Sequence, residues 1–371
     1  MKKNLIIFGT RPEAIKMAPL VKEFFKNDSF ETKVCITAQH REMLDQVLEF
    51  FEIIPDFDLN LMKPNQSLYS LTGDIINGLK PVLEEFKPDY VYVHGDTTTT
   101  MAASIAAFYS GAKVCHVEAG LRTYNKRSPF PEEINRSIVG RVCDYHFAPT
   151  ITSKENLLRE NIDENEVLVT GNTVIDALQM SISKVENLED PEINLLKKTL
   201  DFSKKIILVT GHRRENHGQG FINICTALKK IAIENPTIEI IYPVHLNPKV
   251  QEPVYKLLKE IENVKLVAPL SYPAFVWLMN KSYLIITDSG GVQEEAPTLG
   301  IPVLVMRDTT ERPEAVEAGT VILVGTDVKK IELETSELLL NKEKYNKMSA
   351  LHNPYGDGKA CKRIVEFIEN L

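Results

Sequence analysis

Cysteines are few in this sequence, and no two of them form a recognisable pair. The 371 residues include five cysteines, all far apart: Cys35, Cys115, Cys143, Cys225 and Cys361. Because no C-x-x-C spacing occurs, the pattern suggests neither a disulfide framework nor a zinc site. We expect buried, reduced thiols in a cytoplasmic protein that holds no metal.

Long apolar runs and an excess of basic residues are missing too. No run approaches the roughly 18 residues that a membrane-spanning helix needs, and LIIFGTRPEA at 5–14 turns polar too soon for a signal-peptide core. The net charge of −8 argues against a general nucleic-acid binder, whose affinity comes largely from Lys and Arg on phosphates. We therefore expect no membrane and no nucleic-acid partner, while a local basic pocket for a small anion stays open.

The two common nucleotide-binding motifs are also absent. No G-x-G-x-x-G follows the first apolar run, and G-x-x-x-x-G-K-[ST] occurs nowhere in the chain. The sequence thus indicates neither a nicotinamide cofactor nor hydrolysis of a nucleoside triphosphate. We expect an activity that uses no cofactor.

Short apolar runs alternate with longer amphipathic stretches along the whole chain, which indicates an α/β protein with parallel sheets covered on both faces. Expected helices include 12–27, 68–86 and 220–234. The first series of expected strands is 5–8, 33–37, 90–94, 113–118, 145–148 and 167–170. The second series is 206–210, 239–243, 264–267, 284–287, 303–306 and 321–324.

A polar stretch without strand signal, at 182–203, lies between the two series. We therefore predict two doubly wound, Rossmann-like domains, 1–171 and 172–356, with a connecting helix from Thr173 and a last helix at about 357–371 that packs back on the first domain.

Each predicted domain begins with the same kind of strand end. The apolar run stops at Gly9 or Gly211, and an arginine follows two places on, Arg11 or Arg213. Since open α/β sheets bind ligands beyond the carboxyl ends of their strands, we expect both turns to face one inter-domain cleft.

The stretch TDSGGVQEEAPTLG at 287–300 gives the clearest sign of a ligand site. A strand ends, glycines let the backbone approach a ligand closely, and free N–H groups at the start of a helix favour a phosphate. The residues concerned are Ser289, Gly290 and Gly291, with Glu294 or Glu295 expected to bind ribose hydroxyls. The alternative is a capped helix without a ligand.

Acidic residues follow the strands of the first domain. Asp96 comes just after one strand, Glu118 ends the next, and Glu132 and Glu133 lie in a later loop. Each alone fits a helix cap or a surface ion pair, but together they supply groups for general acid–base catalysis. From the second domain, GHRREN adds His212, whose usual pKa suits proton transfer or pairing with phosphate. Core roles are expected for His94, His116 and His146.

Taken together, these stretches resemble one family, the bacterial non-hydrolysing UDP-N-acetylglucosamine 2-epimerases. The resemblance covers essentially the whole chain, in order, and includes GTRPEAIKMAPL, TAQHREMLDQ, HGDTTTT, HVEAGLRT, SPFPEEINR, GNTVIDAL, GHRREN, PVHLNP, TDSGGVQEEAP, RDTTERPEA and NPYGDGKA. It implies a GT-B-like fold with an active-site cleft between the domains, a homodimer, and interconversion of UDP-GlcNAc and UDP-ManNAc for cell-surface polysaccharides.

The resemblance also implies roles for single residues. The family's proposed catalytic groups match Asp96, Glu118, Glu132 and His212, and its basic active-site positions match Arg11, Lys16 and Arg136. Contacts with uridine diphosphate match Ser289 and Glu295. We add Arg213, Gly290 and Gly291 as substrate-binding residues. The family is also activated by UDP-GlcNAc bound beside the active site, and the best matches to those contacts are Gln39, His40 and His245.

One departure from the family concerns Tyr124, where related sequences often have glycine. A tyrosine does not take a positive φ cheaply, so the loop before Glu132 is expected to differ in shape.

The expected mechanism depends on the acidity of the hydrogen at C2 of the sugar. The hydrogen on C2 of the sugar has no neighbouring carbonyl and is not acidic, so we expect elimination of UDP to 2-acetamidoglucal, followed by re-addition. The alternatives are a hydrolysing epimerase that releases ManNAc and UDP, an epimerase of a related UDP-diacetamido sugar, and a GT-B glycosyltransferase; a silent sugar-nucleotide sensor is disfavoured by the intact acidic cluster.

Overall fold

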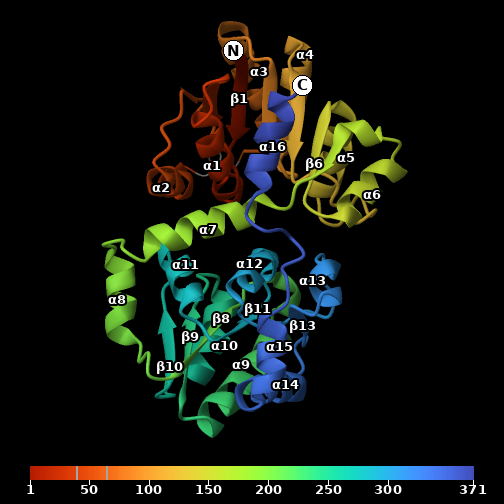
Figure 1. Cartoon of the computed structure of the whole chain (residues 1–371). Helices are drawn as coiled ribbons and strands as arrows, with labels where there is room; N and C mark the ends of the chain where they lie inside the picture. The colour runs from red at the N-terminus through yellow and green to blue at the C-terminus, as the bar shows by residue number, and fades with distance from the viewer. Residues whose placement is uncertain (39–40, 64–65) are drawn as a thin grey trace. The chain divides into compact units, whose positions relative to one another are not determined.

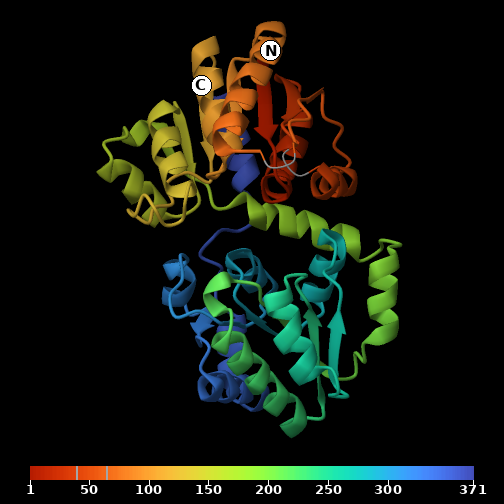
Figure 2. The same ribbon diagram turned by 180° about the vertical axis from the view of Figure 1, so that it is seen from behind.

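The computed structural model describes residues 1–38, 41–63 and 66–371. It divides the chain into two compact units, the first made of 1–180 and 355–371 and the second of 181–354 (Figures 1 and 2). The division lies inside the helix that begins at Thr173, whereas the sequence placed it just before that helix.

The first unit contains a seven-stranded parallel sheet in the order β3-β2-β1-β4-β5-β6-β7. Its strands are β1 (Lys2–Phe8), β2 (Phe30–Ile36), β3 (Phe57–Asp58), β4 (Tyr90–His94), β5 (Lys113–Val117), β6 (Tyr145–Ala148) and β7 (Val167–Val169). The strand order reverses direction between β1 and β4, which is the point where such sheets bind ligands.

The helices of this unit shield the sheet, because its central strands, β1, β4 and β5, are largely buried on both faces. They are α1 (Arg11–Phe25), α2 (Arg41–Phe51), α3 (Leu68–Phe86), α4 (Thr98–Ser110), α5 (Glu132–Val142), α6 (Ile151–Arg159), α7 (Thr173–Val185) and α16 (Ala360–Glu369). The strand side chains of Leu5, Ile7 and Val91 are at most 1% exposed. Each such side chain stabilises the fold by about 1.5–3 kcal/mol.

The last helix, α16, belongs to the first unit and packs against α1 (Figure 1). Its first two backbone N–H groups, of Ala360 and Cys361, donate to the buried carboxylate of Asp176 in α7. Lys2 Nζ of β1 donates to the carbonyl of Ile368 near the end of α16. The final helix therefore completes the unit in which the chain began.

The second unit contains a six-stranded parallel sheet in the order β10-β9-β8-β11-β12-β13. Its strands are β8 (Lys205–Thr210), β9 (Ile238–Pro243), β10 (Val264–Val267), β11 (Leu284–Thr287), β12 (Val303–Val305) and β13 (Val321–Leu323). Its helices are α8 (Pro191–Thr199), α9 (Gln219–Glu234), α10 (Pro248–Leu258), α11 (Tyr272–Asn280), α12 (Gly290–Glu295), α13 (Pro313–Glu317), α14 (Val328–Leu340) and α15 (Lys342–Ser349). All strands predicted from the sequence are present, and only the two-residue β3 was not predicted.

Candidate active site

The turn after β1 is tied to the start of α4 by one buried carboxylate. Glu13 accepts hydrogen bonds from the backbone N–H groups of Gly9 and Thr10 at 3.0 and 2.8 Å, closing a capping box on α1. Its other oxygen accepts from the hydroxyls of Thr97 and Thr100. The turn that carries the half-buried Arg11 is thus fixed against the end of β4.

Glu118 follows β5 directly and lies at the centre of a charged cluster. Its backbone has a φ of 62°, in the left-handed region that a residue with a side chain seldom adopts. The ammonium of Lys16, from α1, bonds to Glu118 Oε2, and His94 Nε2, at the end of β4, lies 3.4 Å from the same oxygen. Strained backbone of this kind is typical of functional sites.

The charges around Glu118 determine its ionisation. Burial raises its pKa, but the nearby Lys16 ammonium and the His94 ring lower it, and the pKa lies well below the usual range of a glutamate. The carboxyl group is therefore ionised at neutral pH and able to accept a proton. His94 was predicted to be a core group; it is buried, but it also belongs to this cluster.

Asp96 lies in the loop after β4 and is held by α5. Arg136 donates from Nε to Asp96 Oδ2 at 2.9 Å, and its Nη2 lies 2.6 Å from the same oxygen. Arg136 Nη1 donates to Glu133 Oε2 at 3.0 Å, and the side chain of Asn135 donates to the backbone carbonyl of Asp96. In this structure Arg136 therefore orients an acidic residue, and Asp96 and Glu133 neutralise its charge.

Glu133 connects α5 to the preceding loop, a role that the sequence did not indicate. Its carboxylate accepts from the backbone N–H groups of Thr123 and Tyr124. Burial raises the pKa of Glu133, but these two N–H groups and Arg136 bring it below its usual value. The signal that was available is the i, i+3 spacing of Glu133 and Arg136 on one helix face.

The loop before α5 keeps a left-handed residue in spite of its side chain. Tyr124 has a φ of 58°, and its hydroxyl donates to Asn156 Oδ1 at 2.9 Å. The bonds to Glu133 and Asn156 offset the conformational cost. Glu132, the first residue of α5, is half-buried, and within the described part of the chain its Oε2 is buried without a hydrogen-bond partner.

In the second unit, Asp288 shapes the turn after β8. This fully buried carboxylate accepts from the backbone N–H groups of His212 and Arg213 at 2.9 and 2.8 Å, and from the side chain of Asn216 at 3.3 Å. Its Oδ1 lies 3.5 Å from His212 Nδ1. The structure thus brings the end of β11 against the GHRREN turn, a link that the spacing of the two motifs does not reveal.

His212 is stacked on His245, which follows β9. Their ring centroids are 5.5 Å apart, at an interplanar angle of 18°. Burial lowers the pKa of His212, Asp288 raises it, and His245 and Arg213 lower it, so that the net pKa is below the usual value. A neutral imidazole at pH 7 is therefore expected at this position.

The Ser289–Gly290–Gly291 turn begins α12, and two arginines lie beside it. A Cβ built on Gly290 would lie 3.6 Å from the guanidinium carbon of Arg312 and 3.8 Å from Arg213 Nη2. Glu294 accepts from Arg312 Nε at 2.5 Å, while the carboxylate of Glu295 lies near Gly291 and Ser289. The N–H group of Ser289 already donates to Thr287 Oγ1, so the groups at this turn that suit a diphosphate are the guanidinium groups and the backbone at Gly290 and Gly291.

Another arginine, Arg307, follows β12 and has a different partner. It donates from Nε to Glu215 Oε1 at 2.8 Å. The two glutamates of the repeated strand ends therefore differ: Glu13 is buried and closes a capping box, whereas Glu215 is exposed and pairs with an arginine.

Gln39 and His40, predicted for the regulatory contacts, lie outside the described residues. Over 1–38, 41–63 and 66–371, no three His, Cys, Asp or Glu side chains are grouped to hold a metal ion, and no helix there is both long and apolar enough to cross a membrane.

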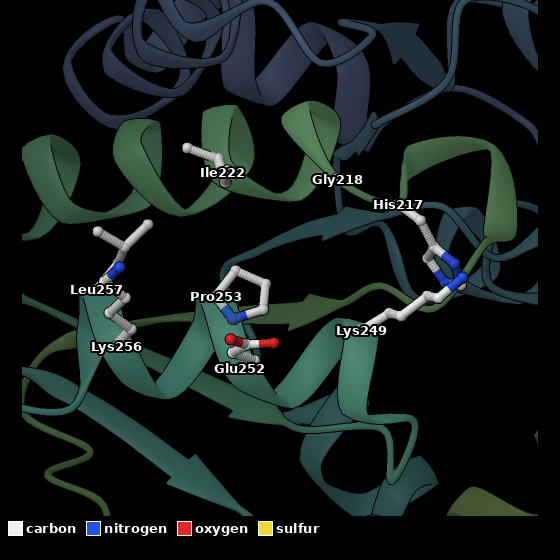
Figure 3. A pocket seen from close by; sticks show the side chains of 8 residues that line it. All are labelled: His217, Gly218, Ile222, Lys249, Glu252, Pro253, Lys256 and Leu257. Atoms are coloured by element: carbon white, nitrogen blue, oxygen red, sulfur yellow. The ribbon is translucent and has the colours of Figure 1, made fainter.

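A groove of about 630 Å³ runs between α9 and α10 of the second unit (Figure 3). It is lined by His217, Gly218, Ile222, Lys249, Glu252, Pro253, Lys256 and Leu257. None of the site residues predicted from the sequence is in this group, so we place no part of the reaction there.

Two Rossmann-like units, one with carboxylates at its strand ends and one with a glycine turn between arginines, define a GT-B-like protein. A family model described as UDP-N-acetylglucosamine 2-epimerase matches residues 22–369. The chain belongs to this family of isomerases.

Individual relatives cover almost the entire chain. The UDP-N-acetylglucosamine 2-epimerases of Yersinia pestis and Escherichia coli (strain K12) are each 59% identical over 370 residues, covering 99% of this chain and 98% of theirs. The crystal structure of UDP-GlcNAc 2-epimerase from Neisseria meningitidis bound to UDP-GlcNAc is 54% identical, with a TM-score of 0.91 and full coverage of both chains. The Methanocaldococcus jannaschii enzyme in complex with UDP-GlcNAc and UDP is 34% identical, with a TM-score of 0.80 and full coverage of both.

Proposed function

We propose that this chain interconverts UDP-GlcNAc and UDP-ManNAc by epimerisation at C2, without a cofactor and without release of free sugar. The observation that carries the proposal is Glu118, an ionised carboxylate held by Lys16 and His94 at a strand end. The relatives named above support the choice of substrate.

The reaction proceeds by elimination and re-addition. A base removes the hydrogen on C2, the electron pair of that C–H bond forms the C1–C2 double bond, and the C1–O bond to the diphosphate breaks. The products are 2-acetamidoglucal and UDP, which remain bound. A proton then returns to C2 on the opposite face, and UDP adds back to C1.

The carboxylates of the first unit carry out the proton transfers in this scheme. Transfer at both faces of C2 requires more than one group or a reorientation of the glycal, and Asp96, Glu118 and Glu132 are the candidates. Glu118 is ionised at rest, and Asp96 is ion-paired with Arg136. Positioned groups of this kind contribute typically 10²–10⁴-fold to a rate.

The second unit stabilises the leaving diphosphate. Negative charge on the departing UDP is met by the hydroxyl of Ser289, by the N–H groups of Gly290 and Gly291, and by Arg213 and His212. Glu295 binds the ribose. Donors already in place cost no reorganisation when charge develops, which makes them effective. Arg11 and Lys16 supply further positive charge from the first unit.

The proposed enzyme is also regulated by its substrate and acts as a dimer. UDP-GlcNAc acts as an activator through Gln39, His40 and His245, and the stacking of His245 on His212 couples such a ligand to the diphosphate site. The active form is a cytoplasmic homodimer.

The test is a proton NMR time course of UDP-GlcNAc with the pure protein in D2O, with nothing else added. UDP-ManNAc with deuterium at C2 of both sugars is the expected result. Free ManNAc with UDP would indicate the hydrolysing reaction instead. An unchanged spectrum would contradict the proposed substrate, and UDP-diacetamido sugars would be offered next.

A further inference from the structure

We propose that His94 is a positioning residue for the C2 proton transfer: together with Lys16 it holds one oxygen of Glu118, Oε2, so that the other oxygen, Oε1, accepts the proton. This inference rests on the proposed function and deepens it. His94 itself touches neither the sugar nor the nucleotide in this scheme, and it acts through Glu118.

The two oxygens of Glu118 have different surroundings. Oε2 bonds to Lys16 Nζ and lies 3.4 Å from His94 Nε2. Within the described residues this ring nitrogen is buried without a hydrogen-bond partner, so its contact with Oε2 is electrostatic and steric. Oε1 faces the turn after β4, where a Cβ built on Gly95 would lie 4.0 Å from it. Gly95 precedes Asp96, so Oε1 points toward the loop that carries the next acidic residue.

The pairing of β4 with β5 places His94 beside Glu118. His94 pairs with Val117 in the β4–β5 register, and Glu118 is the next residue along β5. The hydroxyl of Thr100 donates to the carbonyl of His94, which fixes the backbone. The side chain of His94 is 5% exposed and that of Glu118 is 14% exposed, so water competes little for their contact.

The left-handed backbone of Glu118 sets the direction in which its carboxylate leaves the strand. A φ of 62° points the side chain away from the direction it would take in a continued strand. The bond to Lys16 and the close packing of the His94 ring on the same oxygen restrict the torsions of the carboxylate, and a carboxylate misplaced by about 1 Å loses on the order of 10²-fold in rate.

The charged and titratable groups near His94 come from every element around it. Lys16 and Glu13 lie on α1, His116 and Glu118 on and after β5, and Asp96 in the loop after β4. His116 turns its Nε2 to the carbonyl of Gly95 at 2.7 Å and makes no bond to Glu118 among the described contacts. It is therefore a matched control: a buried histidine of the same sheet, one residue pair away.

The experiment compares His94→Gln and His94→Phe with His116→Gln, after circular dichroism has shown that each variant is folded. His94→Phe is expected to lower kcat about 10–100-fold with KM within about twofold. In this variant, the acid limb of the profile of kcat/KM against pH is expected to move to higher pH, because the His94 ring that lowers the pKa of Glu118 is gone. His94→Gln, which keeps a polar N–H group beside Oε2, restores part of the rate. His116→Gln loses stability but leaves the acid limb in place.

A second readout separates this proposal from the proposed function. The carboxyl carbon of Glu118 is followed by 13C NMR against pH without substrate, in wild type and in whichever His94 variant is folded. A higher midpoint in the variant supports the positioning role even if the wild type does not act on UDP-GlcNAc. An unchanged midpoint, or an unchanged acid limb in an active enzyme, overturns it.

Discussion

At the scale of single residues, carboxylates of this chain differ in what surrounds them. Asp288 accepts three N–H donors and holds a turn, whereas Glu118 faces a lysine and a histidine through one of its oxygens. The sequence indicated Asp96, Glu118 and His212 because strand ends are visible in the pattern. It missed the role of Asp288, because the partners of this residue come from a distant segment. It also missed the role of Glu133, whose partners are near in sequence but meet it only through the shape of the loop before α5.

The acid–base residues give the first prediction. Asp96→Asn and Glu132→Gln should each lower turnover of UDP-GlcNAc by orders of magnitude while UDP still binds, because both changes remove a proton-transfer group and keep the shape. Turnover by NMR and UDP binding by calorimetry test this. Asp74→Asn, which breaks an exposed pair with Lys63, is the control and should turn over like wild type. Wild-type turnover in either catalytic variant removes that residue from the scheme.

Two buried histidines give the second prediction, on stability. Burial lowers the pKa of His116 to about 3 and that of His146 to about 4, whereas an unfolded chain has about 6.5. The unfolded state therefore binds more protons below pH 6.5, and each histidine lowers the free energy of unfolding by about 1.4 kcal/mol per pH unit down to its folded pKa.

Urea unfolding between pH 7 and pH 5 measures this slope. His116→Gln or His146→Gln should reduce it by about one proton, while His352→Gln, at an exposed position, should leave it unchanged. An equal slope in all three variants would mean that the buried rings are not responsible.

At the scale of elements, the periodicity of the sequence predicted nearly all strands, because buried parallel strands are continuous apolar runs. The prediction failed only for a very short strand. β3 has two residues, too few to give a pattern. The end of the first domain was also placed before α7 rather than within it, because a helix that belongs to both units carries no composition change at the boundary.

The docking of α16 gives the third prediction. Asp176→Asn weakens the two bonds from Ala360 and Cys361, and Asp176→Ala removes them, so the free energy of unfolding should fall by about 1–2 kcal/mol for alanine. Hydrogen exchange should become faster in the amides of α16. Asp327→Ala removes the N-cap of α14 in the second unit and should leave α16 protected. Unchanged exchange in α16 of the Asp176 variants would show that this carboxylate does not anchor it.

At the scale of the whole molecule, the proposed chemistry is divided between the two units, and this division gives the fourth prediction. Gly290→Val should weaken UDP binding at least about tenfold, because its branched side chain extends toward Arg312 and Arg213. Gly290→Ala adds only an ordinary contact and should bind UDP nearly as wild type does. Calorimetry tests both. If Gly290→Val binds UDP normally, the diphosphate does not lie at this turn.

The return of α16 to the first unit has a consequence for biosynthesis. The chain leaves the first unit after Met180, builds the second, and re-enters at Tyr355, so the part that the ribosome makes first is finished last. Until the final helix emerges, α1 lacks its neighbour and Asp176 lacks its two donors. The second unit, continuous in sequence, needs no later segment to complete its own sheet. A nascent chain halted before residue 360 should therefore carry a protease-resistant second unit behind a first unit that is still open to cleavage.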